Sequence, residues 1–153
     1  MKILTAIIAI FFIVACKNPK QPEAVVETEP IVSEPQDPDE VTTYSGLKYT
    51  ILKPGRGMPA TEGDEVLFYE TTTYLDGSLL YTNEGSGSPA KILLGGNQAT
   101  QGVDEGLRGM QVGEIRRLIL TPQLARRTEY PENISPDSAI VVKIILDKII
   151  INN

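Results

Sequence analysis

The sequence predicts an α+β fold over residues 44–153, with a curved antiparallel β-sheet wrapped around one short helix. Short segments rich in β-branched and aromatic residues recur between glycine and proline turns, which is typical of strands. Only one segment, residues 101–108, has the spacing of apolar residues expected of a helix. The region has the usual size of a single domain, so we expect one hydrophobic core.

The first strands are separated by clear turn signals. Residues 47–53 alternate in polarity and stop at Pro54 and Gly55. Residues 66–74 lead into Asp76-Gly77, a strong hairpin signal, and residues 79–82 are expected to pair with them across the turn. A glycine- and serine-rich loop then precedes a short strand at residues 90–94. The pattern therefore predicts a hairpin flanked by two shorter strands.

The second half of the domain holds the helix and two more strands. Val103 and Leu107 share one helical face, and Gly109 suits the left-handed residue that ends many helices. Strands are predicted at residues 115–120 and 139–149. In the last strand, alternate apolar residues would face the core: Ile140, Val142, Ile144 and Leu146.

The chain starts with a predicted lipoprotein signal peptide, residues 1–15. Lys2 precedes an apolar run, and Ala15 precedes Cys16, which is the layout of a secretory signal. The run is shorter than the roughly 20 apolar residues that span a bilayer. Residues 13–16 also resemble the bacterial lipobox, which implies acylation of the Cys16 thiol. We therefore expect a lipoprotein of the bacterial cell envelope, held at a membrane (the outer one, on either face) through Cys16. An ordinary signal peptide with an incidental cysteine is the alternative.

Residues 16–43 are predicted to be a disordered, acidic, proline-rich linker. They hold few large apolar side chains, and carboxylates far outnumber lysines. Most of the net charge of −6 therefore lies in the linker and leaves the domain nearly neutral. Such a balance does not suit nucleic acid, which requires a basic surface. The linker is read as a spacer, with an acidic ligand tail as the alternative.

Three stretches of the domain, read in order, carry its most specific motifs. The first is Gly63-Asp64-Glu65-Val66, followed by Leu75-Asp76-Gly77. The second and most specific is Leu94-Gly95 followed by the run from Gly102 through Gly109 to Glu114, which continues to Pro122. The third is residues 134–139. Together these stretches resemble the FKBP family of peptidyl-prolyl isomerases. A single motif can arise by chance, whereas an ordered set across the whole domain is far more specific.

The resemblance implies catalysis without a cofactor or a metal ion. An Xaa-Pro bond isomerises over a barrier of about 20 kcal/mol, and a dry apolar pocket favours the twisted amide over the planar one. The chain has no histidine and one cysteine, so it lacks the residues that commonly bind a catalytic metal ion or activate a nucleophile.

The resemblance also implies a set of pocket residues. The proposed catalytic residues are Tyr81, Thr100 through its backbone N–H, and Val103. The proposed substrate-binding residues are Tyr69, Glu70, Leu80, Ala90, Ile92, Ala99, Arg126, Tyr130 and Val142. Few of them are aromatic, although the family lines its pocket mainly with aromatic rings. Ungapped counting places Glu70 in the pocket, and Tyr69 would enter only through a bulge.

Several of these positions have a simpler interpretation. Leu80, Ile92, Val103 and Val142 could form the apolar pocket floor or simply belong to the core. Glu70 and Arg126 could pair across the pocket mouth, although Arg126 and Arg127 could equally be a solvated loop pair.

Three functions remain open at this point. The first is a prolyl isomerase that assists the folding of exported proteins by binding their Xaa-Pro segments. The second is a binding or chaperone module that has kept the fold but lost fast catalysis, and the third is a structural lipoprotein of envelope assembly. The chain is similar to lipid-anchored isomerases of gliding bacteria. We expect a monomer whose partners are proline-containing polypeptides and, through Cys16, a membrane.

Overall fold

The computed structural model describes residues 39–150. The predicted signal peptide, Cys16 and the linker up to residue 38 lie outside the described residues. Within the described range the elements are, in chain order, β1 (Val41–Thr42), β2 (Lys48–Lys53), β3 (Glu65–Tyr74), β4 (Leu79–Thr82), β5 (Ala90–Leu93), α1 (Gln101–Leu107), β6 (Ile115–Leu120) and β7 (Ile140–Ile150). No helix among them is long and apolar enough to cross a membrane.

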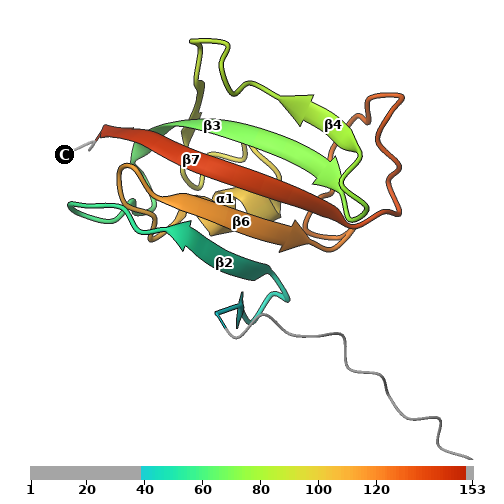
Figure 1. The fold of residues 1–153 in the computed structure, drawn as a ribbon, viewed down its shortest axis with the longest axis horizontal. Coiled ribbons are helices and arrows are strands. Elements are labelled where there is room, and N and C mark those ends of the chain that lie inside the picture. The colour runs from blue at the N-terminus through green and yellow to red at the C-terminus, as the bar shows by residue number, and fades with distance from the viewer. Residues whose placement is uncertain (1–38, 151–153) are drawn as a thin grey trace, which may run out of the picture. The chain divides into compact units, whose positions relative to one another are not determined.

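The strands of residues 39–150 form one antiparallel sheet of seven strands. The order is β1-β2-β6-β7-β3-β4, and β5 pairs with β3 beyond the end of β4. Figure 1 shows the sheet curving across one side of the molecule with α1 behind it. The predicted α+β class, a curved sheet wrapped on one short helix, is confirmed.

The core fills the space between α1 and the inner face of the sheet. Alternate residues of β7 are fully buried, as the sequence pattern predicts: Ile140, Val142, Ile144 and Leu146. They pack with Leu118 and Leu120 of β6 and with Val103 and Leu107 of α1. The alternation follows from strand geometry, because successive side chains point to opposite faces.

Two glycines bring α1 close to β6. Both are buried, and they stand four residues apart on the helix face that meets the sheet. A Cβ at Gly102 would lie 2.6 Å from Cγ of Leu120, and one at Gly106 would overlap the Leu118 side chain. The helix backbone therefore rests directly on the leucines of β6.

Four predicted strands differ from the observed ones by one residue at one or both ends, and two further boundaries differ in ways that affect the fold. The helix ends at Leu107 rather than Arg108, which is already extended (φ −62°, ψ 136°), and Gly109 follows with φ 77° as expected. The sheet also includes Val41 and Thr42, two residues assigned to the linker. They pair with Tyr49 and Lys48, and Glu40 forms an ion pair with Lys48 at 3.1 Å. The ordered fold therefore begins upstream of Tyr44.

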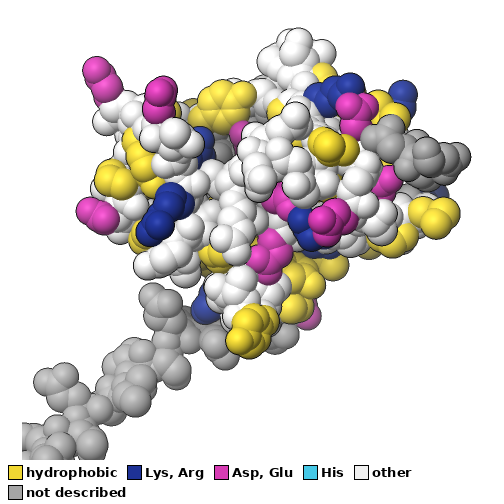
Figure 2. All heavy atoms as spheres, turned by 180° about the vertical axis from the view of Figure 1, so that it is seen from behind, with side chains coloured by type: hydrophobic (Ala, Val, Ile, Leu, Met, Phe, Trp, Pro, Cys, Tyr) yellow, Lys and Arg dark blue, Asp and Glu magenta, His cyan; other side chains and the backbone are white. Residues whose placement is uncertain are grey.

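The back of the molecule carries mixed charge. Figure 2 shows this face, which is opposite to the one seen in Figure 1. Basic and acidic side chains lie next to one another there, and hydrophobic side chains form separate small patches.

Candidate binding pocket

A pocket of about 300 Å³ lies where β3, β4 and the loop between β6 and β7 meet. We call it the Glu70 pocket. Its lining combines two opposite charges with hydroxyl, amide and apolar groups: Glu70, Thr72, Leu80, Tyr81, Arg127, Pro131, Asn133 and Ile134. The chamber is therefore polar on some sides and apolar on others.

Regular alternation along β3 places Glu70 in the pocket. Val66 and Phe68 are buried on the inner face, so Glu70 and Thr72 follow on that face. The register shift between β3 and β7 falls between Leu67 and Phe68, where the extra residue is Asp147 of β7. Alternation in β3 itself is uninterrupted. Tyr69 therefore faces away from the pocket, opposite Ile145, and the ungapped register is the one observed.

Hydrogen bonds from both strands hold the loop that closes the pocket. Nδ2 of Asn133 donates to the carbonyl of Leu80 at 3.0 Å. The Tyr74 hydroxyl donates to the carbonyl of Asn133 and accepts from the N–H of Ser135, each at 3.0 Å. The segment that carries Pro131 and Ile134 is thus tied to β3 and β4.

Glu70 and Arg127 influence each other without forming a close ion pair. Burial raises the pKa of Glu70 above its ordinary value of 4.5, and the positive charge of Arg127 opposes this shift. Among the described residues, no Glu70–Arg127 contact reaches the 4.0 Å of an ion pair. Nε of Arg127 is buried and has no hydrogen-bond partner. Neither charge therefore has a close ion-pair partner within residues 39–150.

The stability of the protein should depend on the ionisation of Glu70. Because the pKa in the folded state lies above that in the unfolded state, stability is lost as the pH rises through 4.5 and beyond. We expect Glu70→Gln to raise the thermal midpoint at pH 7, and this gain to disappear below pH 4.5. The change in thermal midpoint is measured by thermal unfolding at pH 7 and at a pH below 4.5. Glu132→Gln is the control, because Glu132 is exposed. A gain of equal size at both pH values would contradict this account.

The start of α1 borders a second hollow, of about 320 Å³, which includes Ala99, Thr100, Arg126 and Arg127. Thr100 is extended (φ −64°, ψ 152°) and precedes the helix. Its peptide N–H makes no hydrogen bond to the rest of the described chain, and its buried Oγ has no partner either. The two hollows meet at Arg127, which lines both.

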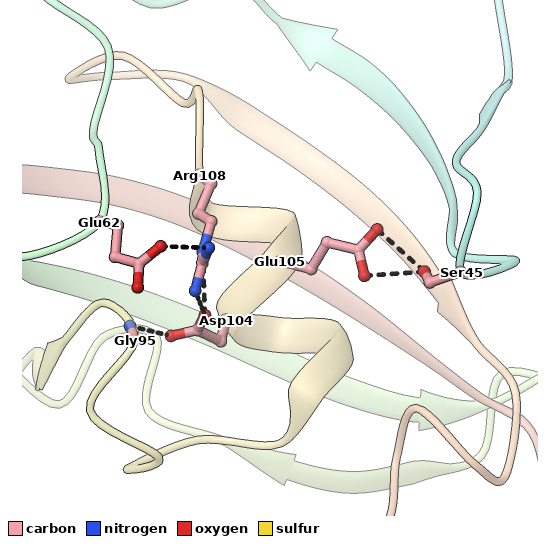
Figure 3. Close-up of polar contacts among 6 residues, drawn as sticks. All are labelled: Ser45, Glu62, Gly95, Asp104, Glu105 and Arg108. Carbon is pink, nitrogen blue, oxygen red and sulfur yellow. Dashed lines mark hydrogen bonds and ion pairs between the residues drawn. The ribbon is translucent and has the colours of Figure 1, made fainter.

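Polar contacts fix α1 and the loop before it, as Figure 3 shows. The carboxylate of Asp104 accepts from the N–H of Gly95 at 2.8 Å and from Arg108 at 2.7 Å. Arg108 also reaches Glu62 at 3.0 Å, and Glu105 accepts from Oγ of Ser45. Three loops are thereby joined to the helix, which holds the position of Thr100 at its start.

Most residues expected on the apolar floor lie in the core. Ile92, Val103 and Val142 are only 7%, 5% and 1% exposed and belong to the main hydrophobic cluster. Ala90 and Ala99 pack against this cluster. Of the apolar floor set, only Leu80 lines the Glu70 pocket, where Tyr81 joins it at 49% exposure.

The possible pairing of Glu70 with Arg126 is not observed, because no ion pair joins them within residues 39–150 and the arginine that lines the Glu70 pocket is Arg127. Arg126 lines the neighbouring hollows instead. Tyr130 lies beside it, and its hydroxyl accepts the N–H of Arg127 at 3.2 Å. Sequence reasoning also missed Thr72, Pro131, Asn133 and Ile134 as lining residues. Thr72 could have been found, since it lies two residues after Glu70 on the same strand face.

The fold and the site together indicate the class of protein. A small antiparallel sheet curves around one helix, and a pocket lies between the β3–β4 hairpin and the loop after β6. A family model described as FKBP-type peptidyl-prolyl cis-trans isomerase matches residues 57–147. The crystal structure of FkpA from Escherichia coli superposes with a TM-score of 0.67 at 25% identity, over 75% of this chain and 53% of that one.

Curated relatives agree with this match. Peptidyl-prolyl cis-trans isomerase FKBP10 of Homo sapiens is 39% identical over 80 residues, which are 52% of this chain and 14% of that protein. Peptidyl-prolyl cis-trans isomerase Mip of Chlamydia muridarum is 29% identical over 130 residues, which are 85% of this chain and 46% of that protein. The chain thus spans less than half of either relative. It belongs to the FKBP-type peptidyl-prolyl cis-trans isomerase family.

Proposed function

We propose that this protein accelerates cis–trans isomerisation of Xaa-Pro bonds in exported polypeptides, and that it acts at a membrane of the cell envelope through acylated Cys16. The observation that carries the catalytic part is the Glu70 pocket of a chain in this family. It shares Arg127 with the hollow at the start of α1, where the N–H of Thr100 makes no hydrogen bond within the described residues. The envelope location rests on the signal and lipobox sequence alone.

The mechanism would need only binding and orientation. Twisting the amide removes its resonance, so that the bond loses double-bond character and charge separation. A proline ring held against Leu80, Tyr81 and Ile134 would leave water behind, which disfavours the polar planar amide. The N–H of Thr100 would donate to a substrate carbonyl and orient the chain. No proton transfer and no covalent bond to the protein are required.

A second candidate is a client-binding module with weak catalysis. It is favoured by the lining of the pocket, because Tyr81 is the only aromatic residue among the described lining residues, while Glu70 and Arg127 add charge. Charged groups keep water close and reduce the benefit of an apolar environment. Such a module would bind proline-containing segments through the same surfaces but turn them over slowly.

A protease-coupled assay on a panel of Xaa-Pro peptides distinguishes the two. We expect the full chain to accelerate isomerisation, and Tyr81→Ala to lower kcat/KM by about tenfold, equivalent to ~1.4 kcal/mol of lost contact in the twisted state. Tyr44→Ala is the matched control, because Tyr44 is fully exposed and lines none of the hollows described. A folded protein that binds these peptides without acceleration would establish the binding module instead.

A further inference from the structure

The two arginines after β6 line a hollow in which none of the described lining residues is acidic. It measures about 480 Å³ and contains Gln101, Gln123, Arg126, Arg127 and Thr128. We call it the arginine hollow. Acidic side chains line neighbouring hollows instead: Glu70, Glu129 and Asp137. The arginine hollow is thus the cationic part of a larger, mixed surface.

Arg127 joins this hollow to the Glu70 pocket, because it lines both. Its Nε lacks a partner, and neither Arg126 nor Arg127 takes part in an ion pair within residues 39–150. Arginine binds a carboxylate through a rigid fork of N–H donors, and such charge-assisted hydrogen bonds are stronger than neutral ones. The hollow therefore has unused donors of the kind that a carboxylate needs.

We propose that Arg126 and Arg127 make the site selective for Xaa-Pro segments that carry an acidic side chain next to the proline. This inference rests on the proposed function, in which the Glu70 pocket receives the proline. Consecutive Cα atoms lie about 3.8 Å apart, so a residue beside a bound proline enters the adjoining hollow. The amide side chains of Gln101 and Gln123 offer donors and acceptors to the same segment.

The chain contains segments with this chemistry in its own linker: Glu29-Pro30, Glu34-Pro35 and Asp37-Pro38. They provide a natural probe. A synthetic peptide with the sequence of residues 27–38 presents all of these bonds, and a second peptide with glutamine or asparagine at the acidic positions is nearly isosteric and neutral. The difference between the two peptides isolates the carboxylate.

The test measures affinity by NMR titration and isomerisation by NMR exchange, both with the full chain. We expect the acidic peptide to bind about fivefold more tightly than the neutral one, because an exposed charge pair contributes up to about 1 kcal/mol. The preference should shrink as salt is added, since partly exposed charges are screened. In the Arg126→Gln/Arg127→Gln double variant it should fall to near parity. Arg56→Gln removes the same charge from a different hollow and should keep the preference.

The inference is overturned if the two peptides bind equally, or if the preference survives in the double variant with its fold intact. It is also overturned if N-acetylglutamate, a carboxylate without proline, binds as tightly as the acidic peptide, since the hollow would then be a general anion site. Selective binding without acceleration would support the inference while contradicting the catalytic proposal. A folded chain that binds neither peptide would contradict both.

Discussion

Replacing Arg116 with methionine is expected to destabilise the protein by about 3 kcal/mol, because this change leaves a buried carboxylate without its partner. Arg116 and Glu114 are 7% and 4% exposed and meet at 2.6 Å. The guanidinium also donates to the carbonyl of Gly106 at 2.9 Å and to that of Arg108 at 3.3 Å, and it lies 4.6 Å from the centre of the Tyr49 ring. One side chain thus satisfies both the carboxylate and the end of α1.

Chemical denaturation of the parent and variants measures this effect. Arg117→Met is the matched control, because Arg117 is only partly buried and belongs to no described ion pair, and we expect it to cost less than about 1 kcal/mol. In Glu114→Gln/Arg116→Met the stranded charge is gone, so part of the lost stability should return. Equal costs for Arg116→Met and Arg117→Met would show that the buried pair contributes little.

Gly106→Val should be comparably damaging, costing about 3 kcal/mol through overpacking. The new side chain would overlap Leu118, and α1 could accommodate it only by moving away from β6. That movement would also disturb the bonds from Arg116 to the end of the helix. Because Thr100 stands at the start of the same helix, peptide turnover should fall together with stability.

Urea denaturation and the peptide assay test this prediction. Gln101→Val adds a β-branched residue at an exposed position of the same helix, and its cost should stay near the difference in helix propensity, below about 1 kcal/mol. If Gly106→Val cost no more than Gln101→Val, the close approach of α1 to β6 would not matter for stability.

The sequence predicted the elements well where local pattern and tertiary structure agree. The strand at residues 115–120 and the return strand of the hairpin have the predicted bounds. Ungapped alternation correctly placed Glu70 on the inner face of the sheet. This worked because the register irregularity between β3 and β7 lies in β7 and leaves the alternation of β3 intact. The predicted glycine stop at Gly109 is present.

The site was harder to predict because loops, which carry no periodicity, complete it. That Arg127 rather than Arg126 lines the Glu70 pocket depends on the path of the chain after β6. Pro131 and Asn133 reach the pocket only because Tyr74 and Leu80 hold that loop. Ile92, Val103 and Val142 were ambiguous between floor and core, since both surroundings require the same apolar side chains.

The place of β7 in the sheet bears on when the chain can fold during its synthesis. It is the last strand along the described residues, yet it lies between β6 and β3 and joins the two halves of the sheet. Until Ile150 has left the ribosome, the hairpin of β3 and β4 cannot be connected to β2 and β6. Sheets that depend on such distant pairings fold slowly. The sheet of the nascent chain should therefore stay in two unconnected parts until β7 emerges.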